Sequence, residues 1–157
     1  MIPTRKLGKT NYHATIFGLG GEGILRTSGY FKEAESVIKK AVEAGVNYFD
    51  TAPAYQQSRD YLGKFLWSYA KRENIFLASK THDRTYEGTL ALVEDSLRRL
   101  KTRYLDLLQL HDLREKDDII GIFSGDGAIH ALEELKNQGK VRFFGITGHH
   151  DPDILVE

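Results

Sequence analysis

The sequence predicts an α/β fold in which parallel strands alternate with helices. Apolar strand patterns and amphipathic helix patterns follow one another along the 157 residues, with a repeat of about thirty residues. The apolar run Leu105–Leu110 is typical of a strand that helices bury on both faces of a parallel sheet. Residues 1–157 are expected to form a single domain, because this length supplies one substantial core.

The N-terminal segment, residues 4–20, predicts a hairpin followed by a buried strand. The sequence Gly8-Lys9-Thr10-Asn11 supplies residues that favour the turn of the hairpin. The strand is the apolar run Ile16–Gly20, which leads directly into Gly21.

Four helices are predicted from apolar residues that recur three and four positions apart. In the first helix, Ala34 and Ile38 begin the apolar face, and Gly45 ends the helix. The other three helices are marked by apolar residues in Tyr61–Tyr69, Leu90–Leu100 and Ala128–Leu135. Asp151 followed by Pro152 has the pattern of an N-cap with proline at the first helical position, so a further helix is expected to begin there.

Strand patterns separate these helices. The predicted strands are Tyr48–Asp50, Ile75–Lys80, Leu105–His111 and Val141–Thr147. Pro53 ends the first of them, because proline has no N–H to donate to a sheet ladder. Residues 112–127 are predicted to form an unusually long loop.

Five strands and four complete helices fit two architectures. A closed (β/α)8 TIM barrel takes about 250 residues, so the chain is either an incomplete barrel of about five βα units or a complete doubly wound sheet. A last helix that stops in its first turn favours the incomplete barrel. The strands at the two edges of such a sheet would be unpaired, and copies of the chain could associate through them.

The composition excludes several classes of protein. Lysine and arginine total 22, as do aspartate and glutamate, so bulk charge gives no reason to expect a nucleic-acid or membrane-surface partner. The absence of cysteine rules out disulfides, thiolate metal sites and a cysteine nucleophile. The N-terminal residues lack an apolar signal region, and no uncharged apolar run is long enough to span a bilayer. A soluble cytoplasmic protein is therefore expected.

Polar side chains end four successive strands of the predicted sheet. Asp50, Lys80, His111 and Thr147 each come at the end of a strand, and Tyr55 follows Asp50 in the next loop. Because the carboxyl ends of parallel barrel strands share one face, these side chains are expected to converge. Each has an ordinary explanation when taken alone, such as a turn cap, a solvated strand end or a structural histidine.

Together, these residues fit the reduction of a carbonyl group. Tyrosine, with a pKa of about 10, donates a proton poorly unless its anion is stabilised. A nearby Lys80 ammonium would lower the pKa of Tyr55, and Asp50 would keep that lysine charged. His111 could hold a substrate carbonyl against the tyrosine hydroxyl. Proteins supply no hydride themselves, so a nicotinamide or flavin cofactor is implied.

The sequence resembles the aldo-keto reductase family from Thr4 to about Thr147. The most specific likeness is Asp50-Thr51-Ala52 with Tyr55, followed by Ala78-Ser79-Lys80 and Gln109-Leu110-His111. Further likeness lies in Arg5–Thr10, Phe17–Gly20 and Leu132–Arg142.

The resemblance implies a (β/α)8 barrel whose N-terminal hairpin covers the bottom, and an enzyme that reduces aldehydes or ketones to alcohols. Tyr55 would be the general acid, Lys80 the neighbour that lowers its pKa, Asp50 the partner of the lysine, and His111 the residue that orients the carbonyl. The cofactor would be NADPH or, less often, NADH.

The resemblance also implies which residues would hold the nicotinamide. Gly20, Gly21 and Glu22 would lie along it, with Asp50 beside them. Many family members carry Ser-Asn after the fifth strand, where this chain has Thr147, Gly148 and His149. Thr147 can supply the hydroxyl and His149 can take the place of the amide. The family's pocket for the cofactor phosphates comes mostly from the last strands and loops, which have no counterpart here.

Three alternatives remain open. The chain could be a catalytically inactive fragment of a reductase, or a non-catalytic binding or regulatory subunit with the same fold. A metal-dependent barrel hydrolase using Asp50, His111, His149 and His150 is disfavoured, because Lys80 would repel a cation. Such hydrolases also usually carry a His-x-His pair where this chain has Gly18-Leu19-Gly20.

Overall fold

Five parallel strands form the sheet in the same order as they occur in the sequence. The computed structural model describes residues 2–157. The strands are β3 (Leu19–Gly20), β4 (Tyr48–Asp50), β5 (Phe76–Thr81), β6 (Leu105–Leu110) and β7 (Val141–Ile146). A doubly wound sheet reverses its strand order at a switch point, and no reversal occurs between β3 and β7. The strand order therefore agrees with the barrel and not with the doubly wound alternative.

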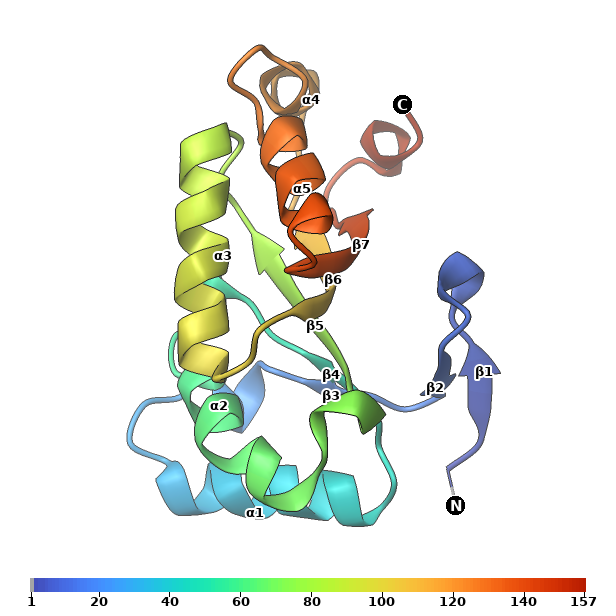
Figure 1. The fold of residues 1–157 in the computed structure, drawn as a ribbon, viewed down its shortest axis with the longest axis vertical. Coiled ribbons are helices and arrows are strands. Elements are labelled where there is room, and N and C mark those ends of the chain that lie inside the picture. The colour runs from blue at the N-terminus through green and yellow to red at the C-terminus, as the bar shows by residue number, and fades with distance from the viewer. Residues whose placement is uncertain (1) are drawn as a thin grey trace.

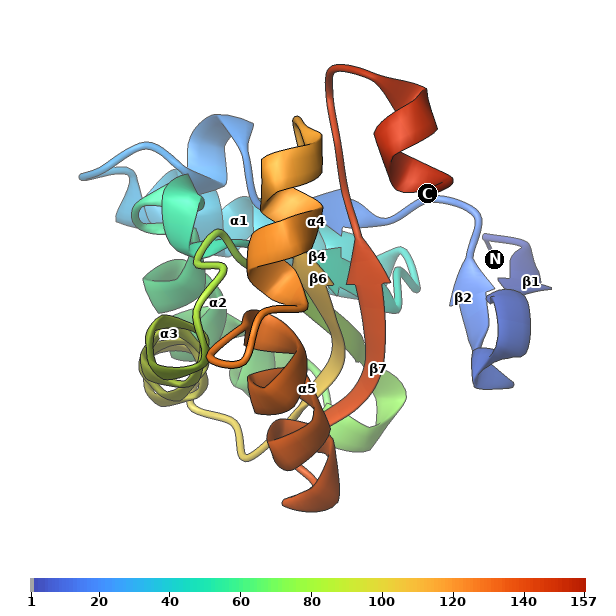
Figure 2. The same cartoon turned by 90° about the horizontal axis from the view of Figure 1, so that it is seen from above.

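The helices cover one side of this sheet (Figures 1 and 2). They are α1 (Phe31–Glu43), α2 (Ser58–Tyr69), α3 (Tyr86–Leu100), α4 (Lys116–Ile122) and α5 (Ala128–Asn137). Helix α1 packs on α2, α2 on α3, and α3 on α5, so the helices follow the winding of the strands. Side chains such as Ile38, Leu66, Leu77, Leu100 and Leu108 fill the core between the two layers. None of the helices in residues 2–157 has the length and apolar character needed to cross a membrane.

The N-terminal hairpin, β1 (Thr4–Lys6) paired with β2 (His13–Thr15), lies away from the helices (Figure 1). The Tyr12 hydroxyl donates to the backbone carbonyl of Asn74 at 2.9 Å, just before β5. The Asn47 side chain, just before β4, accepts from the Thr15 N–H at 2.7 Å. The hairpin is therefore attached to the N-terminal ends of the strands, as expected.

The predicted strand Ile16–Gly20 is wrong in its first part. Only Leu19 and Gly20 pair with β4, whereas Ile16 and Phe17 are 59% and 63% exposed. The N–H of Ile16 donates to the carbonyl of Pro3 at 3.0 Å, so this residue extends the hairpin and not the sheet. The apolar character of the segment could not show which residues pair with the hairpin and which pair with the sheet.

The predicted loop 112–127 contains a helix, α4, that the sequence pattern did not indicate. Asp117 and Asp118 lie in its first turn, where carboxylates are favoured by the helix dipole. Ile122 is its one buried residue. The helix expected after Asp151 is present as a 3₁₀ turn, Pro152–Leu155, and the Asp151 side chain accepts from the Asp153 N–H at 2.9 Å.

Candidate active site

Asp50 and Lys80 form an ion pair at the C-terminal ends of neighbouring strands. Asp50, the last residue of β4, is paired in register with Ala78 of β5. Lys80 is two residues further along β5, so its side chain lies beyond the end of β4. Its ammonium donates to Asp50 Oδ1 and, at 3.2 Å, to the carbonyl of Thr51. The lysine side chain is only 6% exposed. Burial raises the pKa of Asp50 above its ordinary value, although Lys80 acts in the opposite direction.

Tyr55 lies beside this pair. It ends a 3₁₀ turn, Pro53–Tyr55, that follows β4 after Thr51 and Ala52. Its ring centre is 4.9 Å from the Lys80 Nζ and 6.0 Å from the His111 ring centre, with the two rings perpendicular. The tyrosine hydroxyl forms no hydrogen bond within residues 2–157, and the Lys80 ammonium lies over the ring. Burial, then Asp50 and Glu22, raise the pKa of Tyr55. These effects oppose the lowering expected from Lys80, which stays a prediction.

His111 follows β6, and its N–H donates to the carbonyl of Thr81 in β5 at 2.8 Å. Burial, followed by the charge of Lys80, lowers the pKa of the imidazole below its ordinary value. The neutral imidazole is therefore favoured near neutral pH. A neutral imidazole can donate one hydrogen bond from a ring nitrogen to a carbonyl oxygen.

The residues after β7 are only partly arranged as the sequence suggested. The hydroxyl of Thr147 accepts from the Asp112 N–H at 2.9 Å, so this oxygen is directed at the neighbouring loop. Gly148 is closely packed, since a Cβ there would lie 2.9 Å from the carbonyl of Leu113. His149 is exposed, with its ring centre 6.5 Å from that of His111.

The segment Gly20–Glu22 lies against the turn that follows Asp50. Gly21 is buried, and a Cβ there would lie 2.8 Å from the carbonyl of Asp50 and 2.3 Å from Ser58 Oγ. Glycine is required at this position because the two backbones approach so closely. Gly20 and Glu22 are exposed on either side, and Glu22 pairs with Arg26 at 3.5 Å. A flat cofactor ring could approach the backbone at Gly20, where a Cβ would meet nothing within 4 Å.

Metal chemistry gains no support from the described part of the chain. Within residues 2–157, no three histidine or acidic side chains are grouped so that they could hold a metal ion. The carboxylate of Asp50 is already paired with Lys80, and His150 Nε2 lies 3.8 Å from Asp112.

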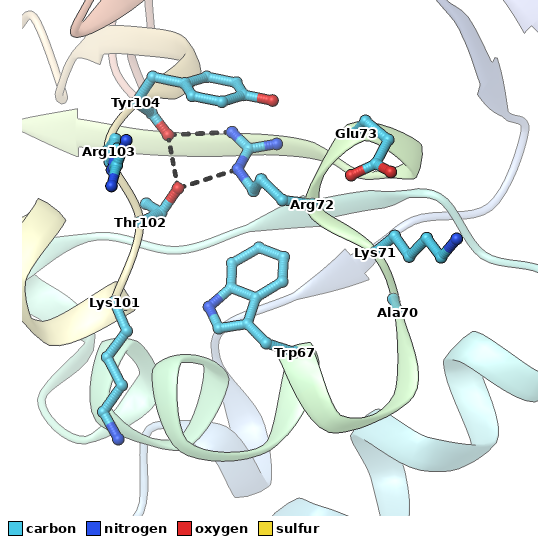
Figure 3. A pocket seen from close by; sticks show the side chains of 9 residues that line it. All are labelled: Trp67, Ala70, Lys71, Arg72, Glu73, Lys101, Thr102, Arg103 and Tyr104. Atoms are coloured by element: carbon cyan, nitrogen blue, oxygen red, sulfur yellow. Dashed lines mark hydrogen bonds between the residues drawn. The ribbon is translucent and has the colours of Figure 1, made fainter.

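A hollow of about 490 Å³ lies at the opposite ends of the strands, away from these residues (Figure 3). Arg72 is packed there between the rings of Trp67 and Tyr104, 5.7 and 3.8 Å from their centres. Its guanidinium donates to Thr102 Oγ1, the Tyr104 carbonyl and Asp106 Oδ2 at 3.0, 2.9 and 2.7 Å. The Arg72 guanidinium therefore already has its hydrogen-bond partners within the protein, and the hollow is the outer surface of a structural contact.

A model of the aldo/keto reductase family matches residues 16–156. The chain belongs to the aldo/keto reductase family. It is 33% identical to the uncharacterized oxidoreductase YqkF of Bacillus subtilis, over 98% of the chain and 51% of that relative. L-galactose dehydrogenase of Arabidopsis thaliana is 32% identical, over 94% of the chain and 49% of that relative. The chain thus spans about half the length of the curated relatives it matches.

Solved reductases of this family have the same fold. The holo form of AKR11C1 from Bacillus halodurans matches with a TM-score of 0.79 at 31% identity, over 94% of this chain and 51% of that one. A reductase from Brucella melitensis matches with a TM-score of 0.75 at 30% identity, over 98% and 56%. The five-stranded sheet is therefore an incomplete TIM barrel, as the sequence predicted.

Two residues next to His111 were not predicted from the sequence. Arg84 lies in the loop after β5 and donates to the carbonyl of His111. Asp112 follows His111, and its N–H donates to the Thr147 hydroxyl. Neither residue type is unusual in a loop. Their contacts could be anticipated only from the pairing of β5 with β6, which brings the two loops together.

Proposed function

We propose that the protein is an NADPH- or NADH-dependent reductase that converts an aldehyde or ketone into an alcohol, with Tyr55 as the proton donor. The observation that carries this proposal is the grouping of Asp50, Lys80, Tyr55 and His111 at the C-terminal ends of adjacent strands in a member of the aldo/keto reductase family. Catalytic side chains of barrel enzymes lie at this end.

Tyr55 fits the role of general acid. Its raised pKa keeps the hydroxyl protonated at neutral pH. The same rise makes proton donation harder, so the anion that forms must be stabilised during the reaction. When the proton passes to the carbonyl oxygen, the resulting phenolate lies beside the Lys80 ammonium, whose charge stabilises it. Asp50 holds that ammonium in place.

His111 fits the role of orienting the substrate. Its ring centre lies 6.0 Å from that of Tyr55, and we expect one substrate oxygen to accept hydrogen bonds from both side chains. The lowered pKa of His111 keeps the imidazole neutral, so that it does not replace Tyr55 as the acid.

The nicotinamide of the cofactor would supply the hydride. Gly20, Gly21 and Glu22, together with Asp50, would hold one side of it. Thr147, Gly148 and His149 would hold the other. The approach of Gly21 to the Asp50 backbone and the open backbone at Gly20 support this placement. Preference for NADP over NAD rests on the family resemblance.

The substrate is proposed only as a class, a small molecule with an aldehyde or ketone group. The relatives include an L-galactose dehydrogenase and a glyoxal reductase, which share interconversion of a carbonyl and an alcohol. A cytoplasmic location is part of the proposal. Association of copies through the edge strands β3 and β7 stays a prediction, for which the mass in solution by sedimentation is the measurement.

The Tyr55→Phe variant tests the proposed function. It removes only the hydroxyl, so carbonyl reduction should fall by about 100-fold or more, while cofactor binding measured by fluorescence stays unchanged. Tyr104→Phe is a matched control, because Tyr104 lies at the opposite end of the strands. Equal turnover of Tyr55→Phe and wild type would show that another group donates the proton.

A further inference from the structure

Arg84 links the loop after β5 to the backbone of His111. Its Nη2 donates to the carbonyl of His111 at 2.9 Å and to that of Asp112 at 3.2 Å. The contact is possible because β5 and β6 are paired up to Thr81 and Leu110, so the loops that follow them start side by side.

A second contact fixes the guanidinium from the other side. Arg84 Nε donates to Asp118 Oδ1 at 2.8 Å, and the second oxygen of Asp118 accepts from the Arg114 N–H at 2.8 Å. Burial acts to raise the pKa of Asp118, but the hydrogen bond from Arg84 and the other contacts hold it below its ordinary value. Helix α4 is thereby connected through Arg84 to the end of β6.

The backbone that Arg84 holds is in an unfavourable conformation. Asp112 has a φ of 57°, in the left-handed region that L-residues rarely adopt. Such a conformation persists only where the surroundings hold it. The N–H of His111 donates to Thr81, and the N–H of Asp112 donates to Thr147. With the two carbonyls on Arg84, every backbone polar group of His111 and Asp112 is held.

We propose that Arg84 is a positioning residue, which holds the His111 backbone so that the imidazole faces Tyr55. This inference deepens the proposed function and rests on it. Arg84 does not contact the reacting groups and acts only through His111. The ion pair with Asp118 sets the direction of the guanidinium.

Arginine suits this role better than lysine. The planar guanidinium donates to Asp118 from Nε while Nη2 donates to both carbonyls. A lysine ammonium is a single centre on a flexible stem, and it could keep the charge without keeping this geometry. Arg84→Lys keeps the positive charge but loses the hydrogen-bond geometry, so it tests whether the geometry of Arg84 matters apart from its charge.

The experiment compares Arg84→Lys and Asp118→Asn with the control Arg99→Lys. Arg99 also forms a helix-surface ion pair, with Asp60 at 2.8 Å, but contacts no residue of the candidate site. In Arg84→Lys, kcat should fall and KM for the carbonyl substrate should rise, with a combined loss of roughly 10- to 100-fold. The cofactor dissociation constant should stay unchanged.

A second readout does not depend on turnover. NMR titration of the His111 imidazole should show its midpoint moving upward toward the ordinary histidine value in Arg84→Lys and Asp118→Asn, because a released ring gains solvent. Arg99→Lys should titrate like wild type. If the wild type reduces no carbonyl, the proposed function fails, and this titration still decides the positioning role. Unchanged kinetics and an unchanged His111 midpoint in Arg84→Lys would overturn the inference.

Discussion

The burial of Lys80 is the reason why the candidate site needs Asp50. A buried ammonium loses its hydration, and only a nearby carboxylate and further hydrogen bonds offset that cost. Asp50 and the Thr51 carbonyl meet this need. The same contacts fix the ammonium beside the Tyr55 ring, so the interactions that make burial possible also set the geometry of the site.

Stability should depend on pH through His111. Its folded pKa is lowered, whereas the unfolded chain has an ordinary histidine pKa of about 6.5. Below that pH the unfolded state binds a proton first, so the free energy of unfolding should fall as the pH drops toward the folded pKa. Urea titrations at about pH 8 and about pH 5.5 measure this difference.

His111→Asn should remove part of this pH dependence. The effect should be small, because the ring is only half-buried and solvent screens it. His13→Asn is the control, since His13 is exposed on the hairpin. The same loss of stability on acidification in His111→Asn and wild type would contradict the prediction.

At the scale of elements, the sequence predicted long periodic segments well and short ones poorly. Helices α1, α2, α3 and α5 extend over enough turns for their apolar faces to repeat. Helix α4 has only seven residues, so its apolar spacing cannot be told from chance. The strand-end residues Asp50, Lys80 and His111 followed from the alternation alone, but the contact of Lys80 with the Tyr55 ring depends on turn geometry that no spacing encodes.

Gly63 sets the distance between α2 and α3. A Cβ at this position would lie 1.9 Å from the backbone carbonyl of Arg99. A backbone atom cannot move aside alone, so Gly63→Ala must push the two helices apart. We expect a loss of about 1–3 kcal/mol in the free energy of unfolding, despite the better helix propensity of alanine. Gly125→Ala, where a Cβ meets nothing within 4 Å, is the control for urea unfolding. Equal stability of the two variants would show that α2 and α3 do not need the close approach that Gly63 permits.

At the scale of the whole molecule, the two ends of the strands have different tasks. The candidate site occupies the C-terminal ends. The hairpin is held at the N-terminal ends through Tyr12 and Asn47. Barrel enzymes commonly divide chemistry and stability between these two ends. Changes at the N-terminal ends should therefore affect folding without affecting the chemistry.

Asp106 offers the sharpest test of this division. It is 2% exposed, and its carboxylate pairs with Arg72 at 2.7 Å and with Arg142 at 2.9 Å. The carboxylate also accepts a hydrogen bond from the Leu77 N–H at 2.9 Å, so Asp106 connects β6 to both β5 and β7. Removing one partner of a buried pair leaves uncompensated charge, so Asp106→Asn should lower the free energy of unfolding by about 3–5 kcal/mol.

The matched control for Asp106→Asn is Glu94→Gln, which breaks the exposed pair with Lys140 and should cost less than about 1 kcal/mol. Urea unfolding measures both losses. Turnover is then compared per folded molecule in the absence of urea, at a temperature where both variants remain native. Asp106→Asn should match the wild type there, because Asp106 lies at the other end of the strands from Lys80 and Tyr55. Impaired turnover of Asp106→Asn per folded molecule would show that the two ends are coupled, since only transmission along β5 or β6 could then carry the effect to the site.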